Sequence, residues 1–139
     1  RLDNLKHGPA LQQAHEIQKN AAQIGFDFPN VQDAYGKLEE ELEEFKQAMQ
    51  ENNSDEILDE FGDCLFSLVN VGRKLGVSSE MALLSTIHKF RSRFAFIEDQ
   101  AAIQNKNIEN MSLEEMDELW EQAKVYLKHQ VQNDNKKEE

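Results

Sequence analysis

Acidic residues recur at helical spacing in two neighbouring stretches of the sequence. The stretch KLEEELEEF, residues 37–45, contains the pattern E-E-x-x-E, and the stretch EFGD, residues 60–63, contains E-x-x-D. Residues three or four positions apart lie on one face of a helix. Several carboxylate oxygens on such a face suit a hard divalent ion, Mg²⁺ or Mn²⁺. The candidate metal ligands are Glu40, Glu41, Glu44, Glu60 and Asp63.

Either acidic pattern alone is typical of a solvated helix surface, because glutamate is a good helix former. Asp63 is more informative, since aspartate is a poor residue for the middle of a helix and here it follows Gly62 within an apolar stripe. If the two helices pack antiparallel around the NNSD turn, residues 52–55, the two acidic sets lie at matching levels. Converging carboxylates repel one another unless a cation neutralises them. The pair of motifs therefore predicts a metal site.

A second candidate set is basic and aromatic. In HKFRSRF, residues 88–94, Lys89 and Arg93 are four positions apart and share a helix face, which suits a polyphosphate clamp. An ordinary basic turn near a helix C-terminus is the competing interpretation. Trp120, in LWEQAK, is either a core residue or a stacking platform for a nucleobase, with Lys124 one turn further on.

Helices must position these residues. Only two prolines and six glycines punctuate the chain, and strand-length runs of β-branched residues are missing, so we expect an all-α fold. Short breaks favour antiparallel neighbours in a bundle, and wide apolar stripes predict pairing with a second copy. We expect one domain over residues 1–130 and a frayed polar tail over 131–139. The helices are predicted at residues 9–24, 31–51, 55–75, 79–100 and 113–130.

Composition narrows the classes of function. A formal charge of −12 argues against a surface that coats DNA or RNA, although a bound divalent cation would still admit a nucleotide. The single cysteine, Cys64, excludes an internal disulfide and fits a reducing compartment. The sequence has no apolar run long enough to span a bilayer and no signal-peptide pattern, so we expect a cytoplasmic protein with no membrane partner. The chain begins at Arg1 without an initiator methionine, which leaves open whether it is an excised piece of a longer protein.

Four blocks together resemble the MazG nucleoside triphosphate pyrophosphohydrolases. With the GFDFPN loop, residues 25–30, they resemble in particular the C-terminal domain of the two-domain bacterial MazG. The blocks are KLEEELEEF, DEFGDCLFSLVNVGRKLG, HKFRSRF and LWEQAK, and the similarity covers residues 11–128. The resemblance implies an all-α bundle that dimerises. It also implies Mg²⁺-dependent hydrolysis of NTPs or dNTPs to the monophosphate and pyrophosphate, with broad base tolerance and a role in nucleotide-pool house-cleaning.

The resemblance also implies roles for individual residues. The five carboxylates would bind the metal, and Lys89, Arg93, Trp120 and Lys124 would contact the nucleotide. We expect Glu41 or Glu44 to act as general base, and Lys89 and Arg93 to stabilise the leaving group. Two alternatives stay open: a more selective pyrophosphatase for dUTP, dCTP or phosphoribosyl-ATP, and a non-catalytic acidic helical dimer that acts as an adaptor.

Overall fold

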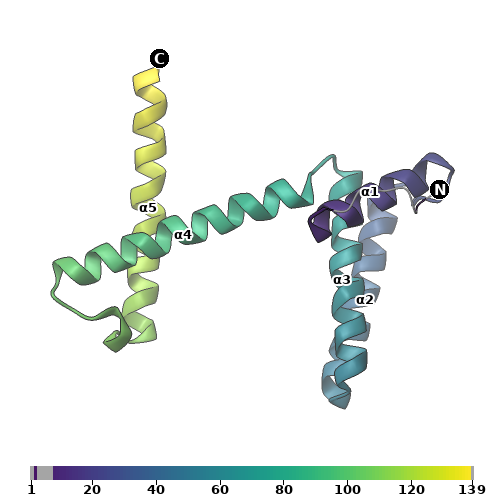
Figure 1. Cartoon of the computed structure of the whole chain (residues 1–139), viewed down its shortest axis with the longest axis horizontal. Helices are drawn as coiled ribbons and strands as arrows, with labels where there is room; N and C mark the ends of the chain where they lie inside the picture. Colours follow the sequence, from purple (N-terminus) through teal and green to yellow (C-terminus); the bar gives the residue numbers. More distant parts are fainter. Residues whose placement is uncertain (1, 3–7, 139) are drawn as a thin grey trace. The chain divides into compact units, whose positions relative to one another are not determined.

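The computed structural model describes residue 2 and residues 8–138, and all the regular secondary structure in this part of the chain is helical (Figure 1). No strand occurs among these residues, which confirms the predicted all-α fold. The chain divides into two compact units, residues 1–83 and 84–139, and each is described by itself. The elements are α1 (Ala10–Gln23), α2 (Val31–Glu51), α3 (Ser54–Lys74), α4 (Ser79–Ile103), the short 3₁₀ helix η2 (Ile108–Asn110) and α5 (Leu113–Glu138).

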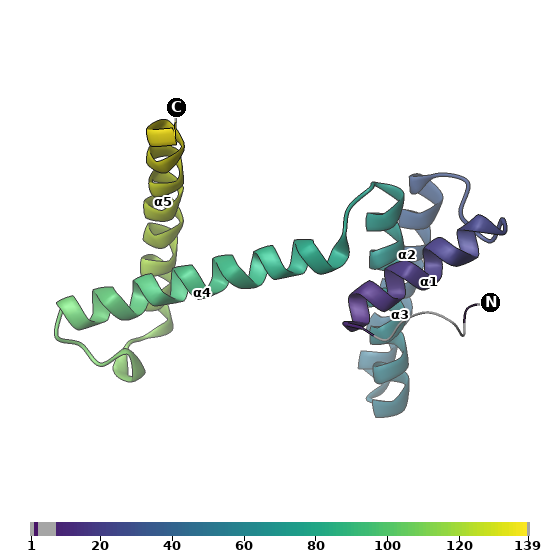
Figure 2. The same cartoon turned by 45° about the horizontal axis from the view of Figure 1, so that its top comes forward.

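The first unit is built around a hairpin of α2 and α3, which lie side by side and antiparallel (Figures 1 and 2). The turn needs only two residues because Asn52 adopts a left-handed conformation, with φ of 55°, which asparagine tolerates better than most residues. Asn53 then caps α3, since its Oδ1 accepts a hydrogen bond from the Glu56 amide at 3.2 Å. The short turn brings the acidic stretch of α2 opposite that of α3.

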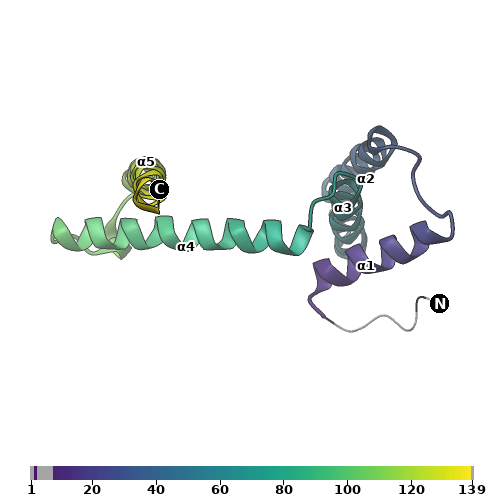
Figure 3. The ribbon, with the colours of Figure 1, turned by 90° about the horizontal axis from the view of Figure 1, so that it is seen from above.

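The core of the first unit lies in the seam between α2 and α3. Ala34, Leu38 and Val71 are buried there, and the rings of Phe45 and Phe61 meet across the seam with centroids 5.6 Å apart. Helix α1 packs against α3, as the view along the hairpin shows (Figure 3). The apolar stripes read from the sequence therefore place α2 and α3 face to face.

The second unit has its own core, where α5 crosses α4 (Figure 1). Its buried residues come from both helices and from the segment that joins them: Ile97, Ala101, Met111 and Leu119. A capping box opens α5, because Ser112 Oγ accepts from the Glu115 amide at 3.1 Å. The core of the second unit is thus formed by α4, α5 and the segment between them, which follow one another in the sequence.

Helix boundaries agree closely for the first four helices, and α2 has the predicted bounds. The fifth helix continues to Glu138, beyond the predicted end near residue 130, and η2 was not predicted. The helix continues through residues 131–136, which are exposed, although Asn133, Asp134 and Asn135 are poor helix formers. Among the described residues, no helix is both long enough and apolar enough to cross a membrane.

Candidate active site

Three of the predicted ligands converge in the first unit. Oxygen atoms of Glu41, Glu60 and Asp63 all lie within 4.8 Å of one another, a separation that one ion can bridge. Glu41 is buried, Glu60 is half-buried and Asp63 is exposed, so the cluster opens from the helix seam towards solvent. The structure therefore brings together one residue of the first acidic motif and both residues of the second.

The electrostatics of this cluster favour a cation. Burial raises the pKa of Glu60 above its ordinary value, and the charge of the nearby Glu44 raises it further, followed by Asp63 and Glu41. Oε2 of Glu41 and Oε2 of Glu60 are both buried without a hydrogen-bond partner among the described residues. Buried oxygens of this kind are costly unless something neutralises them. The donor set thus fits a hard divalent ion with oxygen ligands.

Glu40 departs from the predicted ligand set. Its side chain is 62% exposed and lies 3.8 Å from Lys37 Nζ rather than with the three converging carboxylates. Lys37 also lies 3.1 Å from Glu41 Oε1, and these neighbouring carboxylates raise the pKa of the lysine. The sequence reasoning missed Lys37, although its i,i+4 spacing to Glu41 is a signal for such an ion pair.

The basic and aromatic residues lie in the second unit. Arg93 stacks its guanidinium 5.3 Å from the centroid of the Trp120 ring, and Phe90 lies 5.2 Å from the same ring. Lys89 is exposed, and Lys124 pairs with Glu121 at 3.2 Å. Trp120 also packs against the core of this unit. The structure therefore joins Arg93 to Trp120 but does not group Lys89 or Lys124 with them.

A cluster that the sequence reasoning left without a role lies at the C-terminal end of α3. Arg73 donates to Asp27 at 2.5 Å and to Asn70 at 2.9 Å, and Lys74 donates to Asp27 at 3.2 Å and to the Phe28 carbonyl at 2.8 Å. The Arg73 guanidinium in particular holds the pKa of Asp27 below its usual range. These bonds tie the GFDFPN loop, residues 25–30, to α3.

The chain is similar in sequence to known proteins. Residues 30–95 match the family model described as the MazG nucleotide pyrophosphohydrolase domain. The chain is 43% identical over 116 residues to the nucleoside triphosphate pyrophosphohydrolase/pyrophosphatase MazG of Thermotoga maritima. It is 38% identical over 128 residues to the nucleoside triphosphate pyrophosphohydrolase of Escherichia coli.

These alignments cover most of this chain but only part of the relatives. They take in 84% and 88% of this chain and 44% and 48% of the two relatives, so the chain spans about half their length. The matched residues include α2, α3 and the basic stretch of α4, and so contain both acidic motifs. Residues 30–95 therefore form a MazG nucleotide pyrophosphohydrolase domain, and the chain is similar to the two relatives over most of its own length.

Proposed function

We propose that the chain hydrolyses nucleoside triphosphates, or their deoxy forms, to the monophosphate and pyrophosphate, with Mg²⁺ as its metal and Mn²⁺ as a substitute. The observation that carries the proposal is the convergence of Glu41, Glu60 and Asp63 with two buried, unpartnered carboxylate oxygens. The activity for which the two relatives are named supports the reaction class. Broad tolerance of the base, a house-cleaning role and a cytoplasmic location are part of the same proposal.

In this reaction the residues of the chain would have the following roles. Glu41, Glu60 and Asp63 hold the ion, with Glu44 beside Glu60 and Glu40 at the edge. An Mg²⁺ ion held by these carboxylates would supply positive charge to offset that of the triphosphate and would make water more acidic. Glu41 or Glu44 accepts the proton of the attacking water, because each is a carboxylate of this cluster. Water attacks the α-phosphorus atom, and pyrophosphate leaves as the bond between that atom and the oxygen bridging it to the β-phosphorus breaks.

The nucleotide needs cationic partners as well. We propose that Lys89 and Arg93 stabilise the charge that develops on pyrophosphate, and that Lys124 contacts the nucleotide. Trp120 lies against Arg93 and so supports a fixed orientation of that guanidinium. No contact with DNA or RNA polymers is proposed, because the net charge of −12 opposes it.

We also propose that the chain is a homodimer. In α4, every residue from 81 to 90 is exposed, and large apolar side chains are among them: Met81, Leu83, Leu84, Ile87 and Phe90. Exposed apolar groups of this density mark an interaction surface in a protein whose mean hydropathy is −0.73. We propose that a second copy of the chain covers these apolar side chains.

Release of pyrophosphate from a panel of NTPs and dNTPs, with Mg²⁺ and with excess EDTA, tests the activity. We expect Mg²⁺-dependent release, and we expect Asp63→Asn and Glu44→Gln to reduce it at least a hundredfold while the far-UV circular dichroism stays helical. Glu39→Gln, an exposed position on the same helix as Glu44, is the matched control and should keep full activity. Activity in EDTA, or full activity of Asp63→Asn, would contradict the proposal.

The panel also separates the alternatives. Release from one nucleotide alone would favour a selective pyrophosphatase, and a protein that releases pyrophosphate from none would favour a non-catalytic helical dimer.

A further inference from the structure

Lys37 places a positive charge at the edge of the acidic cluster. Its Nζ lies 3.1 Å from Oε1 of Glu41, one of the three converging carboxylates, and 3.8 Å from Oε2 of Glu40. The side chain of Lys37 is 42% exposed, whereas that of Glu41 is 9% exposed. A buried carboxylate of the proposed metal site thus has an ammonium group of the chain itself as its neighbour.

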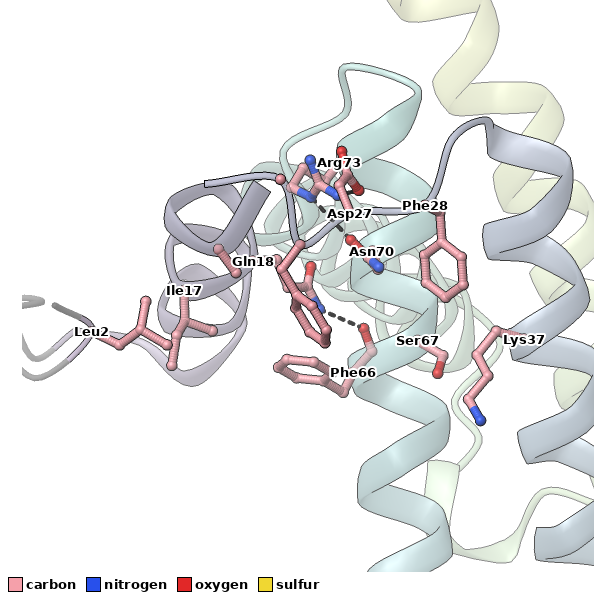
Figure 4. Close-up of a pocket in the computed structure, with 13 residues that line it drawn as sticks. Leu2, Ile17, Gln18, Asp27, Phe28, Lys37, Phe66, Ser67, Asn70 and Arg73 are labelled. Carbon is pink, nitrogen blue, oxygen red and sulfur yellow. Dashed lines mark hydrogen bonds and ion pairs between the residues drawn. The ribbon is translucent and has the colours of Figure 1, made fainter. Parts of the chain in front are cut away.

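Stabilisation of α2 accounts for little of this ion pair. A lysine four residues before a glutamate is the less favourable order for such a pair on a helix. Lys37 also lines a cavity of about 500 Å³ between α1, the 25–30 loop and α3, within the first unit (Figure 4). A lysine whose hydrocarbon chain lies against other elements has fewer positions for its ammonium group than one on an open surface.

The two oxygen atoms of Glu41 have different surroundings. Oε1 has the Lys37 ammonium beside it, whereas Oε2 is buried and accepts no hydrogen bond from any described residue. Oε2 of Glu60 is likewise buried and unpartnered among these residues. Lys37 therefore offsets part of the negative charge of the cluster but leaves its two buried oxygens available to an ion.

The charge of Lys37 has opposite effects on the metal-free and the metal-bound protein. Without metal, the ammonium stabilises the ionised Glu41 against burial and against repulsion from the other carboxylates. A divalent ion in the cluster has the same sign as the ammonium, and repulsion between charges a few ångströms apart is strong at a partly buried site. An ion that binds Glu41 therefore has to weaken the pair between Lys37 and Glu41.

We propose that Lys37 is the counter-ion of the acidic cluster in the metal-free protein and competes with the divalent ion for Glu41, so that it lowers the affinity for free Mg²⁺. The inference rests on the metal site of the proposed function. Removal of the lysine should have two effects of opposite sign, which are lower stability without metal and tighter binding of the ion.

Lys37→Met tests the proposal in the full chain, because methionine keeps an unbranched side chain but has no charge. Lys46→Met, at an exposed position of the same helix, is the matched control with the same change of net charge. We expect Lys37→Met to melt at least about 2 °C below Lys46→Met in EDTA, followed by circular dichroism. Lys37→Arg keeps the charge and should behave as the wild type.

Metal binding is measured without nucleotide, from the electron paramagnetic resonance signal of free Mn²⁺ during a titration of each protein. We expect Lys37→Met to bind Mn²⁺ about threefold to tenfold more tightly than the wild type does. Lys46→Met should keep the wild-type affinity. The Mg²⁺ concentration that gives half of the thermal stabilisation should fall by a similar factor in Lys37→Met alone.

Other results would overturn the proposal. Weaker Mn²⁺ binding by Lys37→Met would mean that the lysine positions Glu41 for the ion instead of competing with it. Equal affinity, or equal stability in EDTA, of Lys37→Met and Lys46→Met would remove the counter-ion role. If the wild type does not bind Mn²⁺, both this proposal and the proposed function fail. If it binds Mn²⁺ but releases no pyrophosphate, the proposed function fails and the comparison of variants still decides the role of Lys37.

Discussion

Glu60 shows at the scale of one residue how the site is charged before any ion binds. Its carboxyl is held among three other carboxylates in a partly desolvated seam, and its pKa is raised for both reasons. An acid whose folded pKa is raised destabilises the folded state at pH values above its unfolded pKa. That destabilisation is relieved as the pH falls through the folded pKa, or when a cation binds.

Neutralising Glu60 should therefore stabilise the protein in the absence of metal. We expect Glu60→Gln to raise the melting temperature at pH 7 in EDTA, and to lose most of the further increase that Mg²⁺ gives the wild type. Thermal unfolding followed by circular dichroism, with and without Mg²⁺, measures both effects. Glu39→Gln should change neither, and a lower melting temperature for Glu60→Gln in EDTA would contradict this account.

The convergence of Glu41, Glu60 and Asp63 could be predicted from the sequence, whereas the position of Glu40 could not. The helical spacing of Glu41, Glu60 and Asp63, together with a short turn, is enough to bring them together. Glu40 satisfies the same spacing, yet it lies further round the helix and pairs with Lys37. Whether a residue faces the seam or its rim depends on how the helices are rotated about their axes, which a periodic pattern fixes only approximately.

At the scale of elements, the turn between α2 and α3 determines which carboxylates meet. We expect Asn53→Ala to lower the free energy of unfolding by about 1 kcal/mol, because the cap on the Glu56 amide is lost. Urea unfolding measures the change. Gln50→Ala, at an exposed position of α2, should change it by less than about 0.5 kcal/mol. Equal effects of the two substitutions would show that the cap contributes nothing.

The attachment of the 25–30 loop to α3 predicts a dependence on pH. The pKa of Asp27 is lowered mainly by its bond to Arg73, so its stabilising contribution is present at pH values above its unfolded value near 3.8. That contribution is lost as the pH falls through the folded value. We expect Asp27→Asn to reduce the free energy of unfolding by about 1 kcal/mol at pH 7, and the difference from wild type to shrink in acid.

Urea unfolding of the two proteins at pH 7 and at pH 3 measures this dependence. Asp99→Asn, at an exposed position of α4, is the control and should show no comparable difference at either pH. A difference for Asp27→Asn that is the same at both pH values would contradict the assignment to the ion pairs.

Elements were easier to predict than their contacts. The bounds of α2 follow from its apolar period and from the asparagines at its ends. The role of Arg73 could not be read from the sequence, because its partner Asp27 is 46 residues away and lies in a loop. The cavity could not be predicted from the sequence for the same reason, since its lining residues come from α1, the 25–30 loop and α3. Periodicity describes one helix at a time.

For the whole molecule, the exposed apolar face of α4 predicts the oligomeric state. We expect a mass of twice the 16.1 kDa of one chain at micromolar concentration, measured by sedimentation or light scattering. Leu84→Glu and Ile87→Glu should shift the protein to the monomer, since burying an unpaired charge in an interface is strongly unfavourable. Ser85→Glu, outside the apolar arc of this helix, should leave the dimer intact. A wild-type monomer at this concentration would contradict the proposal.

The position of the single tryptophan has a practical consequence. Trp120 lies in the second unit, under Arg93 and beside Phe90, and the first unit has no tryptophan. Its fluorescence therefore reports on the second unit alone, whereas ellipticity at 222 nm reports on the helices of both. If the two signals change together during denaturation, the units unfold cooperatively as one body; if the curves separate, each unit has its own melting transition.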